Sequence, residues 1–200
     1  MLFFISLFSA CYKKQILEYE DENEFIVEPA STGRALRIVG YLNLSEDKNI
    51  INIPPLIKGL PVTEIGPDSM GDFYFFKVTI PDTVINIMDF SLSGNYINDV
   101  TIPKSVREIG NGAFMNNRLT KITIPNSVRK IGYRAFHLNP LIEITIGKDV
   151  ILEMLSGYDT VLKEEWKYTA FEGLEFEEVY EGNGREAGTY IFKDGSWQLE

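Results

Sequence analysis

The most constraining feature of this 200-residue chain is an internal repeat with a period of 22 residues. Copies of one hydrophobic motif begin at Val78, Val100, Ile122 and Ile144. A looser copy begins at Ile51, with five additional residues between Pro54 and the segment that starts at Val62. Fixing the backbone costs about 1–2 kcal/mol per residue, more than the few apolar side chains of one copy return. The period therefore predicts a solenoid whose units are stabilised by stacking on their neighbours.

The copies open with apolar residues that alternate with polar ones, and this segment ends at a proline in all but the copy at Ile144, which has Gly147. Val78 and Ile80 flank Thr79 and are followed by Pro81, and the next two copies repeat this order. Alternation over a few residues is typical of a β-strand, and proline ends it because it cannot donate to a continuing ladder. Further apolar columns follow at the same period, and an asparagine recurs at Asn95, Asn117 and Asn139. We interpret the apolar and asparagine columns as structural.

One copy, ITIPNSVRKIGYRAF at Ile122–Phe136, closely resembles the BspA-like (treponemal-type) leucine-rich repeats of bacterial surface proteins. The segment Leu36–Gly66 is similar to the lead-in of such proteins, and Phe176–Trp197 is similar to a closing segment of spirochaetal members. The resemblance implies a leucine-rich-repeat solenoid, mainly β, with short helical or irregular convex segments. It also implies binding of, or adhesion to, other proteins.

We expect one leucine-rich-repeat domain over residues 25–197, with an N-terminal cap at 25–50, repeats at 51–152 and a C-terminal cap at 153–197. A solenoid needs caps because its core is open at both ends. Residues 25–41 should form capping strands, and residues 153–171 a helix or irregular segment over the other end. The Asp194-Gly195 pair between short apolar segments predicts a β-hairpin.

The N-terminus indicates export. Residues 2–10 are apolar but too few to span a bilayer, which needs about 20. The order Phe8-Ser9-Ala10-Cys11 resembles a bacterial lipobox, which implies a signal peptide at 1–11 and a lipid on Cys11. Residues 12–24 would then be an acidic tether on the bacterial cell envelope, surface-exposed or periplasm-facing. The alternative is a hydrophobic strand with a buried free cysteine.

Charge and composition exclude several classes of function. The chain has a formal net charge of −10, which disfavours nucleic-acid binding, although residues 77–149 carry a net +3. A single cysteine and a single histidine exclude an internal disulfide and a Cys-rich or multi-His metal site. No nucleotide-binding or nucleophile motif appears. We therefore predict no catalytic residue, cofactor or metal, and we interpret His137 and the pairs Glu164-Glu165 and Glu177-Glu178 as surface groups.

The outward positions of the repeated strands are the candidate partner-binding residues. The hydroxyl column comprises Thr79, Thr101, Thr123 and Thr145. The column of alternating charge comprises Lys77, Asp99, Lys121 and Glu143, and the arginine column comprises Arg107 and Arg129. Adjacent strands lie about 4.8 Å apart, so each lysine should lie beside a carboxylate. The columns predict either a recognition surface for a protein ligand or a row of weak surface ion pairs.

These observations favour a non-enzymatic envelope lipoprotein that binds protein partners, with adhesion to host or matrix proteins implied by the family resemblance. The first alternative is a periplasm-facing scaffold or assembly lipoprotein with no host ligand. The second is an enzyme that uses carboxylates of the C-terminal cap.

Overall fold

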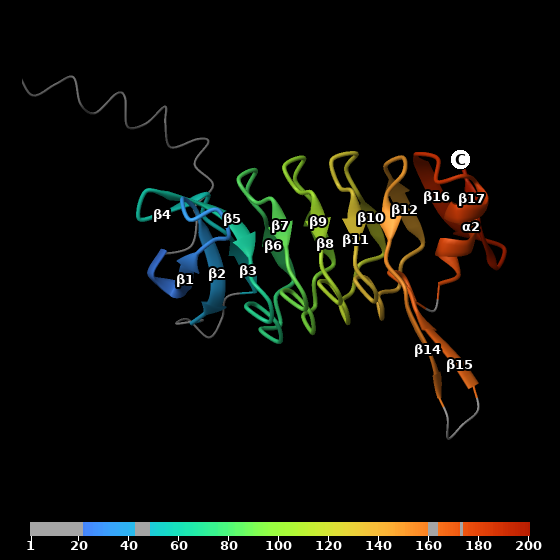
Figure 1. The fold of residues 1–200 in the computed structure, drawn as a ribbon, viewed down its shortest axis with the longest axis horizontal. Helices are drawn as coiled ribbons and strands as arrows, with labels where there is room; N and C mark the ends of the chain where they lie inside the picture. The colour runs from blue at the N-terminus through green and yellow to red at the C-terminus, as the bar shows by residue number, and fades with distance from the viewer. Residues whose placement is uncertain (1–21, 43–48, 160–163, 173) are drawn as a thin grey trace, which may run out of the picture.

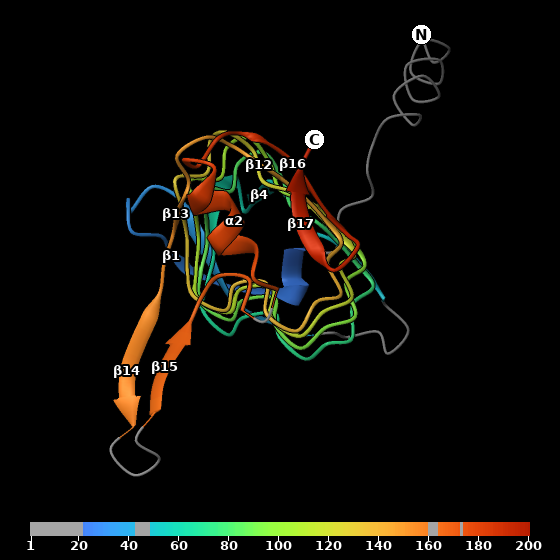
Figure 2. The same cartoon turned by 90° about the vertical axis from the view of Figure 1, so that its right-hand side faces the viewer.

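The computed structural model describes residues 22–42, 49–159, 164–172 and 174–200, with the backbone alone for 155–159 and 164–168. The chain winds into an elongated solenoid whose turns lie side by side, in chain order, from the N-terminal to the C-terminal cap (Figure 1). Viewed along the long axis, successive turns nearly superpose (Figure 2). The predicted mainly β leucine-rich-repeat solenoid is confirmed.

The predicted repeat strands form one side of the solenoid, which we call the strand face. It comprises β3 (Ile50–Asn52), β6 (Lys77–Thr79), β8 (Asp99–Thr101), β10 (Lys121–Thr123) and β12 (Glu143–Ile146). Strands β3, β6 and β8 pair in parallel, as do β10 and β12, and the repeats pair residues 22 apart, such as Val78 with Val100. In the part of the chain that the structure describes, no strand pairing joins β8 to β10.

A second sheet runs along another side of every turn. After β5 (Leu60–Ile65), its repeat strands are β7 (Asn86–Ile87), β9 (Glu108–Ile109), β11 (Lys130–Ile131) and β13 (Ile151–Leu152), all parallel. The sequence had indicated only an apolar column here. The isoleucine of each of the strands β5, β7, β9 and β11 is buried, so this column forms the second wall of the core.

The asparagine column supplies the hydrogen bonds that apolar side chains cannot make inside the turns. Asn117 is 6% exposed, and its Oδ1 accepts from the backbone N–H of Ile97 at 2.9 Å. Its Nδ2 donates to the carbonyls of Leu92 and Phe114 at 2.9 and 3.1 Å. Asn95 and Asn139 repeat this pattern one turn away on either side. Buried backbone groups need such partners, so the column is structural, as predicted.

The N-terminal cap contains the predicted strands. The antiparallel pair β1 (Phe25–Pro29) and β2 (Leu36–Tyr41) follows a single 3-10 turn at Glu22–Glu24, and β2 adds in parallel to β5. The five-residue insertion in the first copy becomes a hairpin, in which β4 (Leu56–Ile57) pairs with the start of β5. Lys58 and Gly59 both have positive φ, as a two-residue hairpin turn requires.

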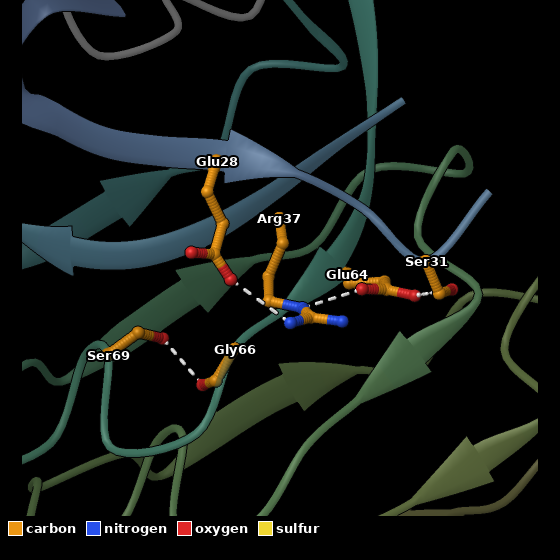
Figure 3. Close-up of polar contacts among 6 residues, drawn as sticks. All are labelled: Glu28, Ser31, Arg37, Glu64, Gly66 and Ser69. Atoms are coloured by element: carbon orange, nitrogen blue, oxygen red, sulfur yellow. Dashed lines mark hydrogen bonds and ion pairs between the residues drawn. The ribbon is translucent and has the colours of Figure 1, made fainter. Parts of the chain in front are cut away.

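A buried carboxylate joins this cap to the first repeat (Figure 3). Glu64 is 3% exposed, and its carboxylate accepts from Arg37 Nε and from Ser31 Oγ, both at 2.6 Å. Burial alone would raise the pKa of Glu64, but the hydrogen bonds from Ser31 and Arg37 and the charge of Arg37 outweigh it and hold that pKa below 4.5. Arg37 also bonds to Glu28 at 3.0 Å. The charge of Glu64 is therefore buried together with the hydrogen-bond donors Arg37 and Ser31 that stabilise it.

The expected helix or irregular cover at residues 153–171 is wrong. Instead, β14 (Leu155–Asp159) and β15 (Glu164–Tyr168) form an antiparallel hairpin that projects away from the solenoid (Figures 1 and 2). The sequence at 165–168 alternates charged and aromatic residues, which is a strand pattern. The end of the core is covered by α2 (Phe176–Gly182), which lies across the last turn in Figure 2.

The predicted C-terminal hairpin is confirmed as β16 (Gly188–Lys193) and β17 (Ser196–Leu199), joined at Asp194-Gly195. Both turn residues have positive φ, 53° and 82°. Strand β16 pairs antiparallel with β12, so it covers the edge of the strand face. Glu177 is only 8% exposed and accepts a hydrogen bond from the N–H of Phe171, so its assignment as a surface group is wrong; Glu178 is exposed as expected.

Candidate partner-binding surface

The threonine column lies along a shallow groove of about 1120 Å³ on the strand face. Thr101 and Thr123 are exposed, and Thr145 lines the far end of the groove. Thr145 is not fully available, because its hydroxyl lies 3.0 Å from that of Thr189 on β16. Thr79 is half-buried and lies outside the groove. The structure thus gathers three of the four predicted threonines.

The turns that follow the strands form the other wall of this groove. The residues there include Pro103, Lys104, Ser105, Asn126 and Ser127. The Oγ atoms of Ser105 and Ser127 are buried and make no hydrogen bond within the described part of the structure. Sequence reasoning had treated the prolines only as strand ends. The serines also recur at the 22-residue period, and this recurrence could have identified the second wall.

The column of alternating charge forms one ion pair. Lys77 Nζ lies 2.8 Å from Asp99 Oδ2, and the two side chains are 49% and 62% exposed, so the pair contributes little to stability. Lys121 and Glu143 are neighbours in register on β10 and β12, but their side chains form no ion pair in the described part of the structure. Because β8 and β10 are unpaired, the predicted row of alternating ion pairs is interrupted after its first step.

The arginine column lies at the start of the second sheet, and its residues do not line the threonine groove. Arg107 and Arg129 are exposed on adjacent turns, and their backbones are joined by a hydrogen bond of 2.8 Å from Arg129 N to Arg107 O. The Nη1 of Arg107 donates to carbonyls of its own turn, including that of Lys104 at 3.0 Å. Since Lys104 lines the groove, the arginine column lies next to the groove without lining it.

An exposed aromatic cluster at one edge of the strand face had no counterpart in the sequence reasoning. Tyr74, Phe76 and Tyr96 gather there with Arg118, whose guanidinium carbon lies 3.9 Å from the centre of the Tyr96 ring. Tyr74, Tyr96 and Arg118 follow one another at the 22-residue period. That spacing was a usable signal, but the change from tyrosine to arginine hid the column.

Two smaller grooves lie elsewhere on the described surface. One, of about 310 Å³, lies on the second sheet and includes Lys130 and Glu153, whose side chains form an ion pair of 2.8 Å. The hydrogen bond to Glu153 raises the pKa of Lys130 despite partial desolvation. The other groove, of about 430 Å³, lies against the C-terminal cap between Ile142 and Phe192.

Neither a cluster of possible metal ligands nor a candidate membrane-spanning helix is found among the described residues. They include no group of three or more His, Cys, Asp or Glu side chains that could hold a metal ion. His137 is half-buried, and its Nδ1 lies 3.0 Å from the carbonyl oxygen of Glu172. No helix in the same part of the chain is both long and apolar enough to cross a membrane. Cys11 and most of the acidic tether lie outside the described residues.

Comparison with known proteins agrees with this architecture. The BspA type leucine rich repeat region model matches residues 59–155 in six copies, and this part of the chain belongs to that family. No curated protein matches the chain significantly.

Solved leucine-rich-repeat structures are similar over part of the chain. A Treponema pallidum leucine-rich-repeat protein is 19% identical with a TM-score of 0.49, over 64% of this chain and 71% of that one. A Bacteroides capillosus leucine-rich-repeat protein is 25% identical with a TM-score of 0.49, over 62% and 94%. A leucine-rich cell surface protein of Faecalibacterium prausnitzii is 18% identical with a TM-score of 0.34, over 76% and 61%.

Proposed function

We propose that this protein is a non-catalytic binding protein of the bacterial cell envelope that holds protein partners on its solenoid surface. The observation that carries the proposal is the groove of the strand face, where Thr101 and Thr123 are exposed opposite the turn residues that follow each strand. Stacked repeats characteristically provide extended surfaces of this kind for protein partners. Membership of the BspA-type repeat family supports a surface role.

The proposed attachment is a lipid on Cys11, followed by the acidic tether of residues 12–24. One acyl chain anchors a protein only marginally, so the proposal requires a multiply acylated cysteine. Metabolic labelling with a palmitate analogue should mark the protein and should fail for Cys11→Ser. If the Cys11→Ser variant still fractionates with membranes, another element attaches the protein.

The proposed partner is a host or matrix protein. Full-length protein immobilised on beads should capture such a protein from serum or matrix extract, and charge reversals at Lys121 and Arg129 should reduce the capture. The short strand face makes the affinity of one copy modest, and many copies on one membrane would raise it. Capture that is unchanged by both reversals would show that these columns do not contact the partner.

Protease treatment of intact cells tests the orientation. A surface-exposed protein should be cleaved while the envelope is intact. If the protein survives until the envelope is broken, it faces the periplasm, and the adhesion part of the proposal fails while the binding part stands.

A further inference from the structure

Four side chains form what we call the aromatic–arginine cluster: Tyr74, Phe76, Tyr96 and Arg118. The Tyr96 ring lies 5.3 Å from the ring of Tyr74 and 5.9 Å from that of Phe76, measured between centroids. The guanidinium of Arg118 lies over the same tyrosine at 3.9 Å. Tyr74 and Phe76 are 58% and 38% exposed, so the rings form a surface feature rather than part of the core.

The repeat architecture does not require aromatic side chains at these positions. Asn98 and Thr120 occupy the place of Phe76 in the next two turns, and Pro140 follows Arg118 in its column. The bonds that join the turns here are made by backbone, from Tyr96 N to Phe75 O and from Arg118 N to Ile97 O, both at 2.9 Å. Smaller polar residues would serve the fold equally well, and exposed aromatic surface of this kind is a common mark of a binding site.

Arg118 is oriented by the ring but is not neutralised by the protein. In the described structure its guanidinium forms no ion pair and no side-chain hydrogen bond. Stacking on an aromatic face occupies the plane of a guanidinium and leaves the N–H groups at its rim available. That rim forms a fork that fits a carboxylate through two parallel hydrogen bonds. Lys121, on the following strand, adds a second exposed positive charge without a described ion-pair partner.

We propose that the aromatic–arginine cluster binds an acidic peptide segment that carries a carboxylate next to an aromatic or large apolar side chain. The guanidinium of Arg118 donates hydrogen bonds to the carboxylate, and Tyr74 and Phe76 pack against the apolar side chain. Charge complementarity favours an acidic partner, because residues 77–149 carry a net +3 in a chain of net −10. Tyrosine and arginine are also the residues most enriched among energetic hot spots of interfaces. This inference rests on the proposed binding function and identifies the class of ligand.

The size of the cluster limits what it recognises. The tyrosine–arginine column crosses three turns, and strands of one sheet are about 4.8 Å apart, so the column is roughly 10 Å long. An extended peptide advances about 3.3 Å per residue. The cluster therefore contacts about three residues, and recognition depends on one carboxylate and one neighbouring side chain.

The test uses the full chain and two labelled peptides, Gly-Ser-Glu-Tyr-Glu-Leu-Gly-Ser and the same peptide with glutamine in place of glutamate. Fluorescence anisotropy at low salt measures both dissociation constants. We expect the acidic peptide to bind at least about tenfold more tightly, the discrimination expected of a charge-assisted bidentate contact. Arg118→Gln should bring this ratio close to one, and Arg118→Lys should restore only part of it because lysine lacks the planar fork.

Matched variants separate the cluster from the rest of the surface. Arg34→Gln removes an exposed arginine of the N-terminal cap, outside the candidate partner-binding columns, and should leave both dissociation constants unchanged. Tyr74→Ser and Phe76→Ser should weaken both peptides about tenfold while keeping the ratio. Thermal unfolding of each variant shows whether the fold is retained; Tyr74 is the more exposed ring and gives the more secure test.

The inference is overturned if wild-type protein binds neither peptide, if it binds both equally, or if Arg118→Gln and Arg34→Gln behave alike. It is distinguishable from the proposed function. Capture of a matrix protein by wild-type protein that binds neither peptide, or binds both equally, refutes the cluster alone. Peptide binding that survives the Arg129 charge reversal, without any capture from matrix extract, refutes the proposed host partner alone.

Discussion

The repeated turns and the C-terminal cap bury aromatic rings in different ways. In the turns, Phe114 and Phe136 lie parallel, with an interplanar angle of 2° and centroids 5.4 Å apart. In the cap, Phe176 meets Tyr190 and Trp197 nearly edge to face, at 87° and 76°. The first arrangement is a translation of one residue onto its equivalent in the next turn. The second joins rings from α2, β16 and β17.

The contrast separates two sources of stability. A turn is stabilised by contacts that the next turn repeats, so the sequence period reveals them. A cap has no further turn beyond it, so its contacts are not repeated elsewhere in the chain. Phe171 connects the two regions, because it stacks on Phe136 at 5.0 Å and meets Phe176 at 4.9 Å. Loss of a cap contact should therefore expose the last turn as well.

The cap ring Phe176 gives the largest predicted effect. Phe176 is 0% exposed, and Phe176→Ala should lower the free energy of unfolding by about 3–5 kcal/mol, the usual cost of removing a buried phenylalanine. Urea denaturation followed by tryptophan fluorescence measures it. Phe192→Ala, in the same cap but 44% exposed, should cost less than about 1.5 kcal/mol. Equal effects would mean that the α2 cluster does not close the core.

The asparagine column provides the corresponding test inside the turns. Asn117→Ala leaves the buried N–H of Ile97 without its acceptor and removes one of the two donors to the carbonyls of Leu92 and Phe114, and should cost about 1–3 kcal/mol. Chemical denaturation should show this loss for Asn117→Ala and almost none for Asn98→Ala, whose side chain is exposed. A neutral Asn117→Ala would indicate that water replaces the amide.

The N-terminal cap should make stability depend on pH. The pKa of Glu64 is lowered in the folded protein, so its contribution is present above about pH 4.5 and is lost as the pH falls through the folded pKa. Wild-type protein should therefore exceed Glu64→Gln in stability at pH 7, with a gap that narrows in acid. Urea midpoints from pH 7 to pH 3 measure this gap, and Glu178→Gln controls for an exposed carboxylate. A gap of constant size would contradict the assignment.

The exposed pair Lys77–Asp99 should give the smallest effect. A double-mutant cycle with Lys77→Ala and Asp99→Ala should yield a coupling of about 0–1 kcal/mol, decreasing with added salt because both side chains are solvated. Thermal or chemical unfolding at low and high salt measures this coupling. A salt-independent coupling above this range would make the charge column structural and weaken its assignment to partner binding.

The candidate surface was only partly predictable from sequence. The period identified Thr101 and Thr123, because an outward strand position remains outward in every turn. It did not predict that β16 would cover Thr145, or that the missing β8–β10 pairing would interrupt the charge column. The cluster around Tyr96 was missed because its column changes from tyrosine to arginine, and because the contact of Phe76 with Tyr96 comes from a different column.

The sequence alone established the solenoid, its buried columns and the hairpin at Asp194-Gly195, since these follow from periodicity and local turn chemistry. It did not establish how the ends close. Strands β14 and β15 form a projecting hairpin instead of a cover, and α2 lies over the core in their place. Cap contacts such as Arg37–Glu64 and Phe176–Trp197 join residues 27 and 21 positions apart without any repeat to predict them. The sequence period predicts the contacts between successive turns, because they are repeated. It does not predict how the caps pack, because each cap contact occurs only once.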